Sequence, residues 1–226
     1  MRTLTASNIT ALLMGAAIFS QFFLLTLYMQ EVLHYSALKT GVAYVGLTLT
    51  IIAFSALSQA LVTRLGVRRV LPVGLALSTV ALVLFARLPV QGHYFSDLFP
   101  GFILSGLGLA LAFVPMSIGA LTGVRAGDAG IASGLINTSQ QIGGAIGVAL
   151  ATTIATTFTT HYVDAHAGTN AFSGAALTHG FQIAFYVLAA LAGLGAVLAA
   201  LMLESKPAQP QVELTTEAAL ELETAA

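Results

Sequence analysis

The sequence contains no cysteine and little charge, and each shortage argues against a class of protein. Without cysteine, the chain cannot form disulfides, thiolate nucleophiles or cysteine-type zinc sites. Only 8% of its residues are charged, whereas a soluble domain usually carries about 25%. The net charge of −1 and the isoelectric point near 6.5 leave no basic surface for nucleic acid. These values disfavour a soluble enzyme, a secreted domain and a nucleic-acid binder.

What the chain has instead is apolar sequence. Of its 226 residues 57% are hydrophobic, and the mean hydropathy is +0.91. Six stretches contain no Asp, Glu, Lys, Arg or His, namely residues 9–29, 41–62, 70–86, 98–121, 129–158 and 181–203. A charge at the centre of a membrane span costs about 2.5–3.5 kcal/mol, and a spanning helix needs about 20 apolar residues. The sequence therefore predicts an all-α polytopic membrane protein, with a six-helix bundle in the lipid bilayer over residues 1–203.

The distribution of Lys and Arg predicts how the bundle is oriented. If the N terminus is cytoplasmic, the outer loops hold Lys39 and Arg87, and the cytoplasmic segments hold the other six, which are Arg2, Arg64, Arg68, Arg69, Arg125 and Lys206. Cytoplasmic loops carry an excess of positive residues. We therefore expect both termini in the cytoplasm, in the cell (inner) membrane, and an outer loop at 159–180. Residues 204–226, with five Glu and two Pro, predict a disordered cytoplasmic tail.

The fifth span, residues 129–158, is the least apolar of the six. Ser133, Asn137 and Gln141 are four residues apart and share a helix face, with Gln140 beside it. Two interpretations are open: these groups hydrogen-bond to neighbouring helices, or they line a polar, water-filled pathway. Because amides are costly in lipid, this face should point into the protein interior. The Asn137 and Gln141 side chains should then face other helices of this chain or a central cleft.

Glycine and proline predict where helices pack and bend. Pro115, in the fourth span, removes a backbone hydrogen bond and should kink its helix. Gly130 and Gly134 form a small-xxx-small pair, and Gly144 lies beside the polar face, so the fifth span should allow close helix approach.

The segment between the second and third spans has the order R-x-G-x-R-R, from Arg64, Gly66, Arg68 and Arg69. Gly66 permits a tight turn with positive φ. The guanidiniums could reach helix C-termini or a carboxylate on a neighbour. The simpler alternative is a positive-inside anchor, which needs only the charge.

This segment resembles the loop motif G-x-L-A-D-R-x-G-R-R of the major facilitator superfamily. Three further stretches are similar to its fourteen-span drug:proton antiporters. The first, FFLLTLYMQEVLHYSALKTGVAY, resembles a link that typically reads LYLQxVLGYSPLxAGLAF, with His34 in place of a glycine. The others are LGLALAFVPMSIGAL, similar to a kinked helix, and GDAGIASGLINTSQQIGGAIGVA, similar to the penultimate span. Together these matches cover about residues 20–150.

The resemblance implies the C-terminal six-helix half of a secondary transporter that exports drugs or other hydrophobic small molecules, coupled to protons, by alternating access. Its partner would be a second six-helix half, which is a missing N-terminal half, a split partner or a second copy in a homodimer. The chain would be a truncated product, an internal start or one piece of a split transporter. The residues expected along the pathway are Asn137, Gln140, Gln141 and Ser133, then Gln21 and Tyr28. Arg64, Gly66, Arg68 and Arg69 would form a cytoplasmic gate loop. The alternative is a non-transporting membrane fragment or interaction subunit.

Other chemistry finds little support in the sequence. A proton-binding carboxylate is absent from all six stretches, and Glu31 at an outer helix end is the nearest, with an interfacial charge as the simpler interpretation. An intramembrane serine protease needs a histidine at membrane depth, and no stretch contains one. There is no phosphate-binding loop, and His161, Asp164 and His166 lack a clean metal-ligand spacing. We therefore expect no enzyme activity, no cofactor and no metal.

Overall fold

The computed structural model describes residues 2–121 and 126–202, and within them the regular structure is helical. The longer helices are α1 (Arg2–Leu27), α2 (Ala37–Ala43), α3 (Val45–Leu65), α4 (Val67–Phe85), α5 (Phe99–Leu121), α6 (Ala129–Ala165) and α7 (Gly174–Met202). Three short helices adjoin them: the π-helices η1 (Tyr28–Val32) and η2 (Tyr94–Leu98), and the 3₁₀ helix η3 (Ala126–Asp128).

In the described part of the chain, six helical segments are long and apolar enough to cross a membrane. These segments are Asn8–Val32, Ala37–Leu65, Val67–Phe85, Tyr94–Gly119, Ala129–Ala165 and Gly174–Leu201. The prediction of an all-α chain with six membrane spans is thereby confirmed. Arg125, Lys206 and the expected tail at 204–226 lie outside the described residues.

Several helices extend beyond the apolar stretches that predicted them. Helix α6 continues to Ala165 and α7 begins at Gly174, so much of the loop expected at 159–180 is helical. Helices α3 and α4 meet at Gly66, whose φ of 81° reverses the chain at one residue. The expected gate loop is thus a single residue flanked by two helices. The apolar stretches end at the first charge, whereas helical hydrogen bonding continues into the interfacial region, where charges are solvated.

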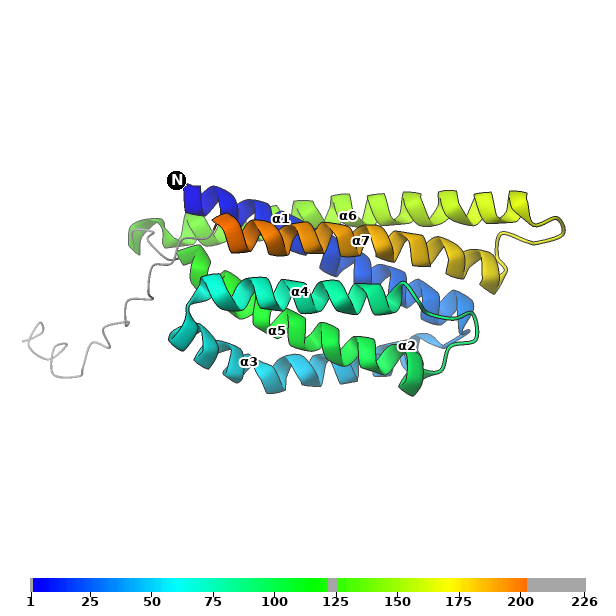
Figure 1. The fold of residues 1–226 in the computed structure, drawn as a ribbon, viewed down its shortest axis with the longest axis horizontal. Coiled ribbons are helices and arrows are strands. Elements are labelled where there is room, and N and C mark those ends of the chain that lie inside the picture. Colours follow the sequence, from blue (N-terminus) through cyan, green and yellow to red (C-terminus); the bar gives the residue numbers. More distant parts are fainter. Residues whose placement is uncertain (1, 122–125, 203–226) are drawn as a thin grey trace, which may run out of the picture.

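The helices pack in an order that differs from their order along the chain (Figure 1). Helix α1 packs most extensively against α6, α4 packs against both α5 and α7, and α3 lies mainly on α5. The N-terminus, the turn between α3 and α4 and the final turns of α7 lie at one end of the bundle, and the α6–α7 connection lies at the other (Figure 1).

The tightest helix contact joins α1 and α6 through glycines on α6. A β-carbon added at Gly143 would collide with the backbone of Leu12, and one added at Gly147 would lie 2.5 Å from the Ala16 Cα. At Gly130 and Gly134, by contrast, an added β-carbon would meet nothing within 4 Å. The close-packing pair is therefore Gly143 and Gly147, and the pair expected from the sequence makes no such contact in the described chain.

The other predicted packing positions have mixed outcomes. Gly144 packs against the ring of Phe19, where an added β-carbon would lie 2.6 Å from Cδ2. Helix α5 continues through Pro115 to Leu121, and the kink expected there stays a prediction.

In the link between η1 and α2, His34 has a φ of 53°. This left-handed conformation favours glycine, the residue that the antiporter sequences typically carry at this position.

The α1–α6 contact predicts a difference between two glycines of one helix. Gly143→Leu should lower the free energy of unfolding by about 2 kcal/mol, because a side chain there forces the α1 and α6 backbones apart. Gly134→Leu raises the helix propensity by the same amount, and its side chain lies in open space. This variant should therefore be as stable as wild type or slightly more so. Thermal unfolding in detergent, followed by circular dichroism, measures both. Equal unfolding midpoints for the two variants would contradict the contact.

Candidate functional site

Helix α6 has three distinct faces. One face is buried against the bundle, through Ala132, Ile136, Gly143 and Gly147. A second face is exposed and apolar, with Ile131, Leu135 and Ile142 exposed by 74%, 45% and 50%. The third face is polar and consists of exposed Ser133, Asn137 and Gln141 together with half-buried Gln140. We call this third set the amide face.

The position of the amide face decides part of an expectation from the sequence. Asn137 and Gln141 were expected to face other helices of this chain or the central cleft between two halves. Both are exposed at the surface of the six helices, so they are not packed inside this bundle, and the central cleft stays a prediction. Spacing by four shows only that residues share a face. Which face packs is decided by the backbone approach that Gly143 and Gly147 allow.

A groove between α5 and α6 adjoins the amide face. Its volume is about 320 Å³, and it is lined by Phe113, Met116 and Ser117 of α5 and by Ser133, Ile136, Asn137 and Gln140 of α6. None of these lining residues carries a formal charge. An aromatic ring, a thioether and a few amide and hydroxyl groups make a surface that suits a largely apolar molecule with few polar groups.

Gln21 and Tyr28, the weaker pathway candidates, lie elsewhere. Both are buried inside the bundle, with exposed fractions of 2% and 1%. The Gln21 Nε2 donates a hydrogen bond to the Ser105 Oγ at 2.7 Å, and the Tyr28 hydroxyl donates one to the Pro89 carbonyl at 2.5 Å. Gln21 thus joins α1 to α5, and Tyr28 joins η1 to the connection between α4 and η2. Neither side chain reaches the amide face, and a place for them along the pathway stays a prediction.

The sequence analysis missed two polar residues that connect helices. One is Ser105, the acceptor for Gln21. The other is Ser139, whose Oγ donates to the Asn8 Oδ1 at 2.7 Å and joins α6 to α1. Each of these serines could have been noticed as a polar residue within an apolar stretch. The sequence does not indicate its hydrogen-bond partner, which is more than 80 residues away. Polar groups of span five therefore serve as helix contacts at Ser139, whereas Asn137 and Gln141 remain exposed.

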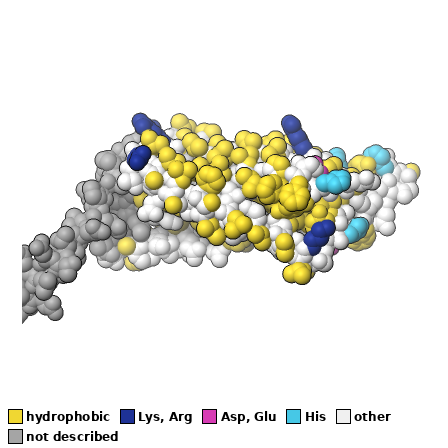
Figure 2. Space-filling model, turned by 90° about the horizontal axis from the view of Figure 1, so that it is seen from below, with side chains coloured by type: hydrophobic (Ala, Val, Ile, Leu, Met, Phe, Trp, Pro, Cys, Tyr) yellow, Lys and Arg dark blue, Asp and Glu magenta, His cyan; other side chains and the backbone are white. Residues whose placement is uncertain are grey.

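The arginines near Gly66 lie at the end of the bundle that holds the N-terminus (Figure 1). Arg64 is exposed at the end of α3, and Arg68 and Arg69 are exposed in the first turn of α4. Figure 2 shows the same pattern over one whole face, with apolar side chains across the middle and Lys and Arg toward the two ends.

Glu31 lines a different cavity, of about 430 Å³, with Leu24 and Leu27 of α1 and threonines of α6. One of these threonines, Thr156, lies 19 residues beyond Asn137 on α6. At 1.5 Å per residue this separation is about 28 Å. The Glu31 carboxylate therefore stands near the opposite membrane interface and does not belong to the groove beside the amide face.

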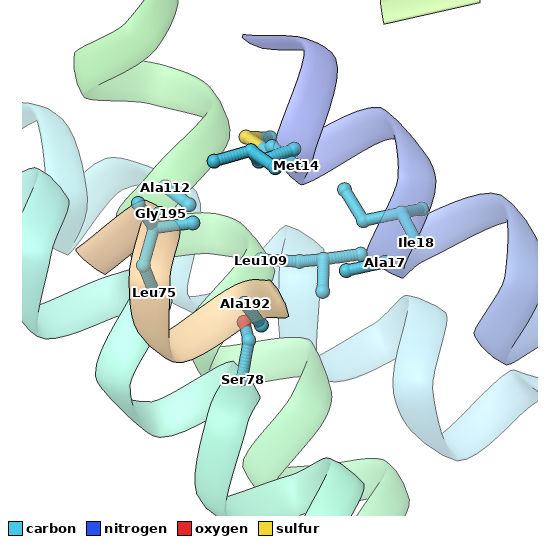
Figure 3. Close-up of a pocket in the computed structure, with 10 residues that line it drawn as sticks. Met14, Ala17, Ile18, Leu75, Ser78, Leu109, Ala112, Ala192 and Gly195 are labelled. Atoms are coloured by element: carbon cyan, nitrogen blue, oxygen red, sulfur yellow. The ribbon is translucent and has the colours of Figure 1, made fainter. Parts of the chain in front are cut away.

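A third cavity lies where α1, α4, α5 and α7 meet (Figure 3). It is lined mainly by apolar side chains such as Met14, Leu75 and Leu109, and its one hydroxyl, on Ser78, donates to the Gly74 carbonyl at 3.1 Å. Its volume of about 10 Å³ is at the lower limit for a single water molecule. This cavity is a packing gap and offers no room for a ligand.

Comparison with known proteins shows the family to which the sequence belongs. Residues 5–148 match the Major Facilitator Superfamily. The chain belongs to the major facilitator superfamily. Its six-helix bundle is one half of a major facilitator fold, and the family is one of membrane transporters.

Relatives of this major facilitator chain include proteins named for antibiotic resistance or export. It is 35% identical over 144 residues to the lincomycin resistance protein of Streptomyces lincolnensis, covering 64% of this chain and 30% of that protein. It is 34% identical over 192 residues to the puromycin resistance protein pur8 of Streptomyces alboniger, covering 84% and 38%. The cephamycin export protein CmcT of Amycolatopsis lactamdurans is 31% identical over 140 residues, covering 61% and 29%. The chain spans about a third of the length of these curated relatives.

The exposed faces of α6 predict different reactivity toward a water-soluble maleimide in open membrane fragments. Asn137→Cys should react, because a thiol reacts as the thiolate, which needs water, and the amide face is expected to be wet. Leu135→Cys should stay unmodified, because its face is apolar and suits lipid or another helix. The chain has no native cysteine, so gel-shift labelling reports each site alone. Labelling of Leu135→Cys with Asn137→Cys unreactive would contradict a wet amide face.

Proposed function

We propose that this chain is the C-terminal six-helix half of a secondary active transporter of the fourteen-span type. The transporter exports hydrophobic drugs or other small molecules, coupled to protons, by alternating access between two halves. The names of the relatives support the class of cargo: one is a lincomycin resistance protein and another a cephamycin export protein.

The observation that carries this proposal is the exposed amide face of α6. Unsatisfied polar groups in hydrocarbon cost several kcal/mol each, so exposing the Asn137 and Gln141 amides to lipid is unfavourable. They need water or polar groups of another chain segment. A second six-helix half opposite this face, with a water-filled pathway between the halves, supplies both. Ser133, Asn137, Gln140 and Gln141 then bind the polar groups of the cargo, and Phe113 and Met116 contact its apolar part.

Helix α3 supports the same arrangement. Its buried residues form a narrow stripe on the α5 side, through Leu47, Thr50, Ser58 and Val62, and most of its other side chains are exposed. A helix with so little contact inside its own bundle has a large surface left for lipid or for a second half.

Proton coupling requires a titratable group at membrane depth, usually a carboxylate. None of the residues that line the amide-face groove is titratable. Glu31 lines the other cavity, whose Thr156 lies about 28 Å from Asn137 along α6. The coupling carboxylate therefore belongs to the second half, and this chain by itself does not transport. Arg64, Gly66, Arg68 and Arg69 form the cytoplasmic gate, in which the one-residue turn at Gly66 holds the guanidiniums at fixed positions.

Transport assays separate a pathway role from a packing role. In the complete transporter, Gln141→Leu should lower drug export about tenfold, since losing one amide interaction with the cargo is worth about 1.4 kcal/mol. Leu135→Ala is the matched control on the apolar face and should leave export close to wild type. Export is measured as dye efflux from efflux-deficient cells at equal protein levels.

Three outcomes would contradict the proposal. If Gln141→Leu exports as well as wild type, the amide face has only a packing role. If the chain expressed alone exports dye in a proton-dependent manner, a second half of different sequence is unnecessary. If no partner half restores export, the alternative of a non-transporting interaction subunit is favoured.

The proposed orientation has its own test in intact cells. With both termini cytoplasmic, Asn170→Cys in the α6–α7 connection should react with an impermeant maleimide added from outside. Val67→Cys, beside the Gly66 turn, should react only after the cells are permeabilised. Both are single-cysteine variants of a chain that has none. The reverse pattern would place the arginines at Gly66 outside the cell.

A further inference from the structure

A second groove, of about 580 Å³, lies between the α2–α3 segment on one side and η2 with the first residue of α5 on the other. It is at the end of the bundle away from the N-terminus (Figure 1). The Tyr94 hydroxyl donates a hydrogen bond to the Ala43 carbonyl at 2.8 Å and holds the two walls together. A β-carbon at Gly46 would lie 3.2 Å from both the Tyr94 oxygen and the Phe99 ring, so the glycine keeps the floor open. The groove is therefore a defined part of the fold.

The groove combines one positive charge with apolar walls. Lys39 stands at its mouth, with its ammonium 3.6 Å from the centre of the Tyr35 ring. This ring contact holds the side chain in place and leaves the positive charge without a neutralising carboxylate among residues 2–121 and 126–202. Val42, Leu49 and Phe95 line the rest and are exposed by 59%, 59% and 77%. A ligand that fits has an anionic end and a long apolar part.

The groove also has the depth of one lipid leaflet. Lys39 is the third residue of the span Ala37–Leu65 and so lies at the membrane interface. Leu49 is ten residues further on, or about 15 Å at the rise of a helix. The hydrocarbon core is about 30 Å thick, so this distance is half of it. An anion bound at Lys39 therefore lies at headgroup depth, and an acyl chain attached to it can follow the groove to the middle of the bilayer.

We propose that this groove binds an anionic phospholipid, with the phosphate paired to the Lys39 ammonium and one acyl chain along Val42, Val45 and Leu49. The charge complementarity favours this occupant, since a lipophilic cation would be repelled by Lys39 and a zwitterionic lipid would bind less strongly. The site is separate from the amide face, because it lies on α2, α3, η2 and the first residue of α5 and has no residue of α6. It does not depend on whether the chain transports.

Because the chain contains no tryptophan, the fluorescence of one introduced tryptophan can test which lipid occupies the groove. In the Leu49→Trp variant, a single indole sits in the groove. The purified chain is reconstituted in bilayers that contain phosphatidylcholine and phosphatidylglycerol, with the acyl chains of one or the other brominated. Quenching of the indole then reports which lipid occupies the groove. We expect a preference of about fivefold for phosphatidylglycerol, since one lysine near an anionic surface is worth about 1 kcal/mol.

Three matched variants make the test specific. Thr48→Trp places the indole at nearly the same depth but outside the groove, and should show little preference. Lys39→Gln in the Leu49→Trp background should lower the preference to about onefold to twofold. Arg87→Gln in the same background removes another positive charge expected at the same interface, and should leave it near fivefold.

The proposal is overturned if Leu49→Trp shows no preference for the anionic lipid or if Lys39→Gln leaves the preference unchanged. It is also overturned if Thr48→Trp shows the same preference, because the lipid would then be ordinary surrounding lipid. An equal loss in Arg87→Gln would indicate general attraction to positive charge and no defined site. Circular dichroism of each variant establishes that the helices are intact before the quenching is compared.

Discussion

Hydrocarbon solvates neither a charge nor an unpaired polar group, and most features of this protein follow from that constraint. It keeps Asp, Glu, Lys, Arg and His out of six stretches of the sequence, and it requires the backbone to be helical across them. It also explains the buried polar contacts: the Gln21 amide has the Ser105 hydroxyl as its partner, and Ser139 has Asn8. Charges collect at the two ends of the bundle, where water is available (Figure 2).

The same constraint applies to the polar side chains of α6 that are exposed on the outside of the bundle. On α6, the face that carries Gly143 and Gly147 is occupied by α1, so the neighbouring face with Asn137 and Gln141 is left outside. An amide at that position stays solvated only if something other than lipid covers it. This exposed face is the reason for proposing a second six-helix half. The chain spans about a third of the length of its relatives.

Particular residues show where inference from the sequence failed. Gly130 and Gly134 have the small-xxx-small spacing, yet Gly143 and Gly147 make the close contact. Both pairs have the same local chemistry, and only the position of α1 distinguishes them. Tyr28 was a candidate for the pathway, and the structure shows its hydroxyl bonded to Pro89, which is 61 residues away along the chain. A pairing over that distance has no local signal.

The sequence by itself determined the all-α class, the six spans and the family, because the cost of burying charge in lipid acts on each residue regardless of its neighbours. It also placed a tight turn at Gly66, since positive φ is a local property of glycine. The tertiary structure decided which helices touch, which face of α6 is left exposed, and that Lys39, Tyr94 and Gly46 meet at one groove. Those outcomes depend on packing between segments far apart in sequence, which neither composition nor periodicity records.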